Sequence, residues 1–275
     1  MNLRVLTLLG LGFLAFSCSS NDGDPIETDK TAPTIKLDDP DNGENVWAGK
    51  ALEFKATFED NAALASYNVT IHSNFDGHSH ARLNVEPFSF DRSFTIEGRK
   101  VEAKQNLDIP VTATAGPYHF VVKAIDKAGN ATSFTDGSSK EVEIWIQNTE
   151  MATTRFLNGS NVEIDEYKVV ANQQVELLGT ITAGNSDLVS VTATLQVDED
   201  DDHTHDHIPA FWSKNFSIAS GTRAVTLQEI FKDEVLVITQ AMINQAKLLG
   251  EDLELQIVVK DAAGNYSRKT LELEF

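Results

Sequence analysis

The chain has one cysteine among its 275 residues, so no disulfide bond can form within it. Only Val5 to Phe16 forms a long apolar run, and this run is too short for a stable membrane-spanning helix. Basic residues are scarce, because 22 Lys and Arg stand against 42 Asp and Glu, which gives a formal net charge of -20. Such a surface repels the phosphates of nucleic acids, so nucleic-acid partners are excluded.

Motifs of common enzymes are also missing. The sequence contains no Gly-x-Ser-x-Gly, P-loop or His-Glu-x-x-His element. Carboxylates are abundant, but no spacing selects a catalytic pair. We therefore predict a protein that is not an enzyme.

The N-terminal segment has the pattern of a bacterial lipoprotein signal. Arg4 precedes the apolar run, and Cys18 follows it after one small residue. Residues 14–18 resemble a lipobox, with the leucine displaced by one position. We expect a signal peptide over 1–17, a lipid on Cys18, and a flexible acidic tether over 18–30. The alternative is an ordinary cleaved signal with an incidental cysteine.

Four segments of the first half recur in the second half in the same order, which indicates a tandem repeat of about one domain each. The pairs are Leu52 to Phe54 with Val175 to Leu177, Leu64 to Ile71 with Leu188 to Leu195, Ser93 to Ile96 with Asn215 to Ile218, and Asp126 to Asn130 with Asp261 to Asn265. The repeats predict domains over 31–146 and 155–275, joined by a linker over 147–154.

Apolar residues alternate with polar ones in both repeats, as in half-buried strands. The residues expected to face the core are Tyr67, Val69, Ile71, Phe120, Val122, Ala124, Val191, Ala193, Leu195, Leu255, Ile257 and Val259. Many short strands of this kind predict an all-β fold of two tandem immunoglobulin-like β-sandwiches after the signal peptide. One short helix is expected over 239–249, ending before Gly250.

Each Asp-x-Ala-Gly-Asn element is expected to form the turn that closes the last hairpin of its domain. Thr31 to Ile35 and this turn together resemble bacterial immunoglobulin-like modules. A calcium role for Asp126 and Asp261 is the alternative to a purely structural turn.

A more specific resemblance rests on Tyr67 to His72, Gly77 to His80, Phe90 to Phe94 and Gly116 to Phe120. These segments resemble the Bacteroidetes lipoprotein family that carries the domain of unknown function 4625. The resemblance covers most of 31–146 and, more weakly, 155–275. It implies immunoglobulin-like domains that each carry a His-x-His loop, and it predicts the fold rather than an activity.

Histidines gather in the first domain at three places. His78 and His80 lie in the loop, His72 ends one predicted strand, and His119 begins another. In an immunoglobulin-like sandwich these two strands pair antiparallel, so we expect all four imidazoles to meet on one outer face. Nitrogen ligands of this kind suit Zn(II), with Cu(II) or Ni(II) on the same grounds.

The second domain offers a different set of potential ligands. Its loop carries His203, His205 and His207 after an acidic run, and Gln196 and Glu254 occupy the positions of His72 and His119. Glu254 and the three loop histidines are therefore the candidates for a weaker metal site. A solvated acidic loop with incidental histidines is an equal alternative.

The function predicted from these patterns is a non-catalytic, lipid-anchored lipoprotein of the outer membrane that binds Zn or Cu. Expected partners are the membrane, through Cys18, and an outer-membrane transporter or a surface glycan. The alternative function is glycan binding or adhesion with the sandwiches as spacers. Its candidate stacking residues are Trp47, Phe75, Phe88, Phe211 and Trp212.

The lipid anchor is directly testable. Replacing Cys18 with alanine is expected to release into the soluble fraction a protein that otherwise fractionates with the outer membrane, because the acyl chains supply the membrane affinity. Cell fractionation and mass spectrometry of the N-terminus measure this. Wild-type protein that is soluble and carries no lipid on Cys18 would contradict the prediction.

Overall fold

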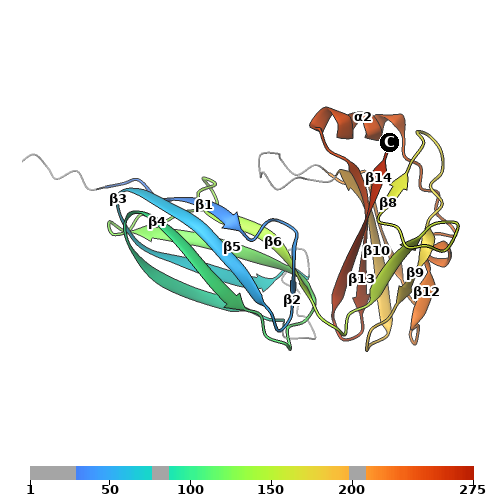
Figure 1. Cartoon of the computed structure of the whole chain (residues 1–275), viewed down its shortest axis with the longest axis horizontal. Helices are drawn as coiled ribbons and strands as arrows, with labels where there is room; N and C mark the ends of the chain where they lie inside the picture. Colours follow the sequence, from blue (N-terminus) through green and yellow to red (C-terminus); the bar gives the residue numbers. More distant parts are fainter. Residues whose placement is uncertain (1–28, 76–86, 198–208) are drawn as a thin grey trace, which may run out of the picture.

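The computed structural model describes residues 29–75, 87–197 and 209–275. The first six strands form one hydrogen-bonded sheet in the order β1-β3-β5-β6-β2, with β4 paired to β3 (Figure 1). These strands are β1 (Thr34–Asp39), β2 (Glu44–Trp47), β3 (Ala51–Ser73), β4 (Phe90–Asp108), β5 (Gly116–Asp126) and β6 (Lys140–Gln147). Parallel pairing of β2 with β6 completes one edge of the sheet.

Two of these strands are much longer than the short strands that the sequence predicts. The first half of β3 pairs with β1 and its second half with β5, while β4 follows it along both halves. The register shifts between Glu59 and Leu64, and such an irregularity lets a strand bend. The two halves then face each other, because the ring of Phe54 lies 5.6 Å from that of Tyr67 and 5.9 Å from that of Phe120. A continuous bent strand thus supplies both layers of the sandwich.

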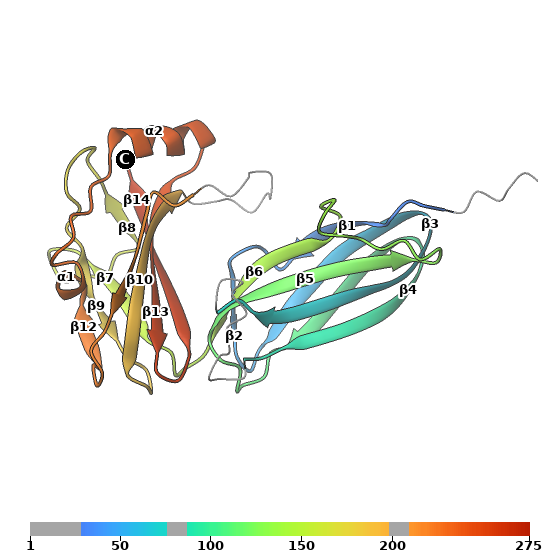
Figure 2. The same cartoon turned by 180° about the vertical axis from the view of Figure 1, so that it is seen from behind.

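In its described residues, the second half of the chain has eight more strands, which form two sheets (Figure 2). The larger sheet has the order β11-β10-β13-β14-β8 and the smaller one β12-β9-β7. These strands are β7 (Thr153–Leu157), β8 (Glu166–Lys168), β9 (Leu178–Thr182), β10 (Leu188–Val197), β11 (Trp212–Ser217), β12 (Ala224–Thr226), β13 (Leu253–Asp261) and β14 (Tyr266–Glu274). Strand β8 pairs parallel with β14, as β2 does with β6 in the first half.

The predicted helix is confirmed as α2 (Gln240–Leu249). The side chain of Thr239 caps its N-terminus, and Gly250 ends it with a left-handed φ of 82°. Ile243 and Ala246 are buried against the core of the second half. A second helix, α1 (Leu227–Ile230), was not predicted from the sequence; it is a single turn closed by a capping box between Thr226 and Glu229.

The predicted alternation of strand residues is also confirmed, since all twelve core positions named from the sequence are buried. Both Asp-x-Ala-Gly-Asn turns form with the same bonds: the backbone N–H and side-chain amide of Asn130 donate to Asp126, and those of Asn265 donate to Asp261. The chain is therefore an all-β protein built as immunoglobulin-like sandwiches.

Tyr118, fully buried near the start of β5, anchors the segment that enters this strand. Its hydroxyl donates to the carbonyl oxygen of Thr114 at 2.9 Å. A tyrosine at this place whose hydroxyl bonds to backbone a few residues upstream is a hallmark of immunoglobulin-like sandwiches. Burial raises the pKa of the phenol, so it remains a hydrogen-bond donor.

The two halves are in contact through β14. The backbone N–H of Tyr266 donates to the carbonyl oxygen of Ala115 at 2.8 Å, and the ring of Tyr266 lies 5.1 Å from that of Phe75. The guanidinium of Arg268 lies 4.7 Å from the centre of the Trp145 ring. These contacts bury Phe75 between the halves.

Replacing Tyr118 with phenylalanine removes the hydroxyl and leaves the carbonyl of Thr114 without this donor. We expect the free energy of unfolding to fall by about 1 kcal/mol, the usual net value of one hydrogen bond. Denaturant unfolding followed by circular dichroism measures the loss. Tyr167→Phe is the control, because the Tyr167 hydroxyl bonds to none of the described residues; equal losses in both variants would contradict the assignment.

Candidate functional site

His72 and His119 lie side by side on the outer face of the first sheet, as the sequence analysis expected. They are direct partners in the register of β3 with β5. Their ring centroids are 5.3 Å apart and the ring planes meet at 87°. The two imidazoles come from strands that are distant in sequence, so the fold itself creates the pair.

The two histidines differ in exposure. His72 is exposed at the end of β3, whereas the side chain of His119 is only 11% exposed. The expectation that both lie on an open face is therefore wrong for His119. Glu141 lies against its ring, and both residues line one groove together with Phe134.

Glu141 of β6 is a site residue that the sequence analysis missed. Its Oε1 lies 3.1 Å from Nδ1 of His119. Val142 and Ile144 face the core, so the alternation of β6 directs Glu141 outward beside β5. The alternation of β6 is visible in the sequence. Placing Glu141 beside His119 also requires the pairing of β6 with β5, which the sequence does not show. A carboxylate that accepts from Nδ1 favours the tautomer in which Nε2 carries the lone pair that binds metal.

A groove of about 320 Å³ runs over this part of the sheet. Its lining is mostly polar and carries one cationic and one anionic side chain besides the histidines. The lining residues are Asn68, Thr70, His72, His119, Val121, Lys123, Phe134 and Glu141. The ammonium of Lys123 lies 4.6 Å from the centre of the Phe134 ring, which is half exposed.

The loop histidines of both domains, His78, His80, His203, His205 and His207, lie outside the described residues. The description of the first loop stops at Phe75, two residues after the end of β3. A site that uses His78 and His80 therefore remains a prediction, and so does the site in the second loop.

In the second domain the equivalent strand positions hold a different pair. Gln196 and Glu254 are register partners between β10 and β13, and the amide of Gln196 donates to Oε1 of Glu254 at 2.7 Å. Glu254 is buried. One of its oxygens thus already accepts a hydrogen bond, which makes it a weaker candidate ligand than an imidazole.

The aromatic residues proposed for sugar stacking are mostly covered. Phe75 is buried, and Phe88, Phe211 and Trp212 are partly buried. Trp47 is about half exposed, and so is Phe134, which the sequence analysis did not consider. In the part of the chain that the structure describes, these two rings are therefore the exposed aromatic candidates.

One group of three carboxylates also converges in the first domain. Asp29, Asp60 and Asp126 form the only set of three or more His, Cys, Asp or Glu side chains among the described residues whose ligand atoms all lie within 4.8 Å of one another. The histidine pair is not part of such a set, so it needs further ligands to hold an ion.

Across the described ranges, no helix has the length and apolar character needed to cross a membrane.

Comparison with protein families gives a match in the first half of the chain. Residues 16–144 match the model described as "Domain of unknown function (DUF4625)", which supports membership of this part of the chain in that family. No curated protein matches the chain.

Several solved structures align with the chain at low sequence identity and with TM-scores below 0.5. The fibronectin(III)-like modules of Clostridium thermocellum CbhA are 12% identical, with 88% of this chain and 93% of that chain covered and a TM-score of 0.26. The GspB Siglec domain is 21% identical over 53% of this chain and 66% of that one, with a TM-score of 0.28. The sialic acid binding region of a Streptococcus sanguinis SK1 adhesin is 14% identical. The match covers 90% of this chain and 78% of that one, with a TM-score of 0.28.

Proposed function

We propose that the protein is a non-catalytic lipoprotein of the cell envelope whose first domain binds a transition-metal ion. The ligands are His72 and His119 from the strands and His78 and His80 from the loop that follows β3. The observation that carries the proposal is the pairing of His72 with His119, with ring centroids 5.3 Å apart on the outer face. In this proposal a lipid on Cys18 holds the protein at the outer membrane, and its partner there is a transporter or a surface glycan.

The chemistry of this pair suits zinc or copper. Imidazole nitrogen is a preferred ligand of Zn(II) and Cu(II), and several such nitrogens from different segments select these ions over magnesium or calcium. Glu141 supports the proposal because a carboxylate on Nδ1 orients the ring of His119 and makes its other nitrogen a better ligand. Four nitrogen ligands give a closed site suited to binding, since catalysis requires an open coordination position.

The second domain is proposed to bind metal more weakly, through His203, His205, His207 and Glu254. Gln196 already donates to Glu254, and the acidic residues of the loop attract cations without fixing a geometry. Such attraction is screened over about 8 Å at physiological ionic strength. Binding at this second site therefore weakens with added salt, whereas binding at the first site changes little.

Calorimetric titration of the full chain in a non-ionic detergent with Zn(II) and Cu(II) tests the first site. His72→Ala/His119→Ala is expected to abolish the tighter binding event, because half of the nitrogen ligands are lost. Glu141→Gln keeps the shape of the side chain and is expected to weaken that event by about 10-fold or more, as for other residues that orient a metal ligand.

Thr70→Ala is the matched control, since Thr70 lines the same groove and offers no nitrogen ligand. Its affinity for zinc should equal that of the wild type. Undiminished zinc binding in the double histidine variant would overturn the proposed site.

Glycan binding or adhesion is the second candidate function. One observation favours it: the exposed ring of Phe134 borders a groove that also offers the polar side chains of Asn68, Thr70 and Lys123. An aromatic face beside hydrogen-bonding groups is the usual arrangement for stacking on a flat, polar ligand.

If the groove binds a glycan, Phe134→Ala should weaken retention on a glycan array by about 10-fold, because the stacking contact is lost. Trp47→Ala is the control, since Trp47 is exposed but does not line the groove. Absence of glycan binding in the wild type, or equal binding in both variants, would exclude this role for the groove.

A further inference from the structure

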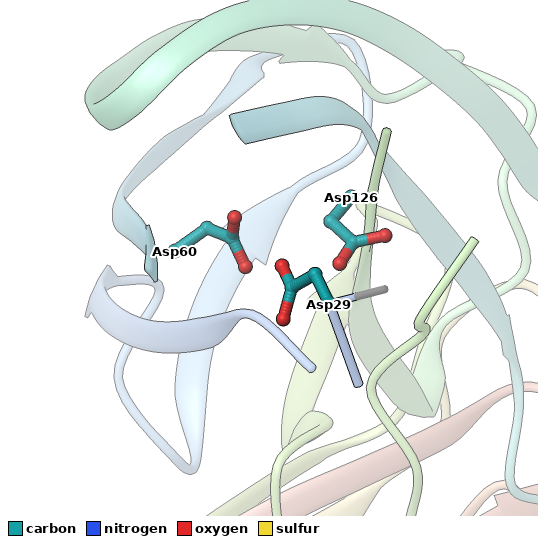
Figure 3. A group of neighbouring side chains, drawn as sticks. All are labelled: Asp29, Asp60 and Asp126. Atoms are coloured by element: carbon teal, nitrogen blue, oxygen red, sulfur yellow. The ribbon is translucent and has the colours of Figure 1, made fainter. Parts of the chain in front are cut away.

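Asp29, Asp60 and Asp126 meet at the end of the first domain where the chain enters it (Figure 3). Asp29 precedes β1, Asp60 lies at the irregularity of β3, and Asp126 ends β5. Figure 3 shows the three carboxylates turned toward one another, although their strands are far apart in the sequence. Asp60 is 9% exposed and Asp126 3%, so these charges are buried.

Each carboxylate is fixed by hydrogen bonds that leave acceptor capacity toward the others. Asp60 Oδ1 accepts from the N–H of Ala62 at 2.9 Å, and Asp29 Oδ1 accepts from Thr31 and Asn61, each at 3.0 Å. The second oxygens, Oδ2 of Asp60 and Oδ2 of Asp29, are buried and have no hydrogen-bond partner among the described residues. Two buried oxygens of this group thus have no hydrogen-bond donor among the described residues.

A nearby positive charge would stabilise three ionised carboxylates that lie this close together. Removing an ionised carboxylate from water without a partner is costly, and like charges within 5 Å add repulsion. In the described ranges, no Lys, Arg or His forms an ion pair with Asp29, Asp60 or Asp126. The hydrogen bonds from Thr31 and Asn61 hold the pKa of Asp29 below its usual value, so this group stays charged.

The second domain has an equivalent place at the turn that begins with Asp261, and it shows that the fold does not require three carboxylates there. Leu188 pairs with Asp261 there as Leu64 pairs with Asp126, and the turn is the same. Gly184, four residues before Leu188, stands where Asp60 stands four residues before Leu64. A Cβ at Gly184 would lie 1.8 Å from the carbonyl oxygen of Glu150, so no side chain fits.

Asn148 takes the place of Asp29, since each lies five residues before the first strand of its half. Its Oδ1 accepts from the N–H groups of Glu150 and Met151, as Asp29 accepts from Thr31. Its Nδ2 donates to Oδ1 of Asn265 at 2.9 Å. At this place in the second domain, the neutral amides of Asn148 and Asn265 therefore accompany one carboxylate, Asp261, where the first domain has three.

We propose that Asp29, Asp60 and Asp126 bind one calcium ion, which fastens the end of the tether to the first domain. An all-oxygen set of carboxylates suits a hard cation. The ligand atoms all lie within 4.8 Å of one another, close enough to contact one cation. Calcium takes several protein carboxylates as ligands, whereas magnesium usually keeps much of its water. Asn130 supports the arrangement, because its Nδ2 donates to the carbonyl oxygen of Asp29 at 3.1 Å.

This calcium site is independent of the proposed histidine site. Asp126 and His119 lie seven residues apart along β5, which corresponds to about 23 Å in an extended strand. The ligand types also differ, since one group offers only oxygen and the other mainly nitrogen. Loss of one site should therefore leave the other intact.

Thermal unfolding of the chelator-treated full chain, with and without calcium chloride, tests the proposal. A calcium concentration of about 1 mM suits the test, because it is about tenfold the Kd of the tighter extracellular calcium modules, about 0.1 mM. Calcium is expected to raise the midpoint of the first-domain transition by at least about 4 °C. Asp60→Asn keeps the size of the side chain and its bond to Ala62, so it should fold, lose this shift and lose one equivalent of bound ⁴⁵Ca in equilibrium dialysis. Zinc binding should not change in this variant.

Asp261→Asn is the matched control, because Asp261 holds the equivalent turn without the other two carboxylates. It should retain the full calcium shift of the first domain. Asp29→Asn, outside the strands, gives a second variant whose folding is not in question and which should also lose the shift. A wild type without saturable ⁴⁵Ca binding, or Asp60→Asn and Asp29→Asn variants with the full shift, would overturn the proposal.

Discussion

The antiparallel register of β3 with β5 is the constraint on which both candidate sites depend. It sets His72 opposite His119 near one end of the strand pair and Leu64 opposite Asp126 at the other. Because side chains alternate between the two faces, a slip of one strand by a single residue would exchange its core and outer faces. The buried rings of Tyr67 and Phe120 therefore fix the positions of the ligands as well as the core.

The second domain repeats this register with different chemistry. Gln196 faces Glu254 where the first domain has two histidines, and a direct hydrogen bond joins them. At the other end, Asn148 and Gly184 replace two of the three aspartates. At each of these two places in the second domain, a single carboxylate accepts hydrogen bonds from a neutral residue, Gln196 in one case and Asn265 in the other. The first domain differs by carrying two imidazoles at one of these places and three carboxylates at the other.

The bend of β3 has a comparable effect on the carboxylates. Asp60 lies where the pairing of β3 is interrupted between Glu59 and Leu64, and this interruption lets the strand turn toward its own second half. The same turn carries Asp60 to the end of β5 and to the chain entering at Asp29. A local irregularity in one strand thus joins three segments, which explains why the group sits at the end of the sandwich rather than on its face.

The sequence by itself determined the features that depend on local periodicity and on the repeat. Alternation identified the buried residues of β3, β5, β10 and β13, and Gly250 marked the end of α2. The repeated Asp-x-Ala-Gly-Asn element identified both turns. The His72–His119 pair also followed, because the order of strands in an immunoglobulin-like sandwich makes their register predictable.

Only the tertiary structure decided which distant side chains complete each site. Glu141 reaches His119 because β6 pairs with β5, and Asp29 reaches Asp60 and Asp126 because the entering chain lies against the bend of β3. The burial of His119 could not be predicted from the sequence either, because alternation indicates only which face of a strand a residue occupies. Alternation specifies which face a residue occupies, whereas the neighbours on that face depend on strand pairing and on how the chain ends pack.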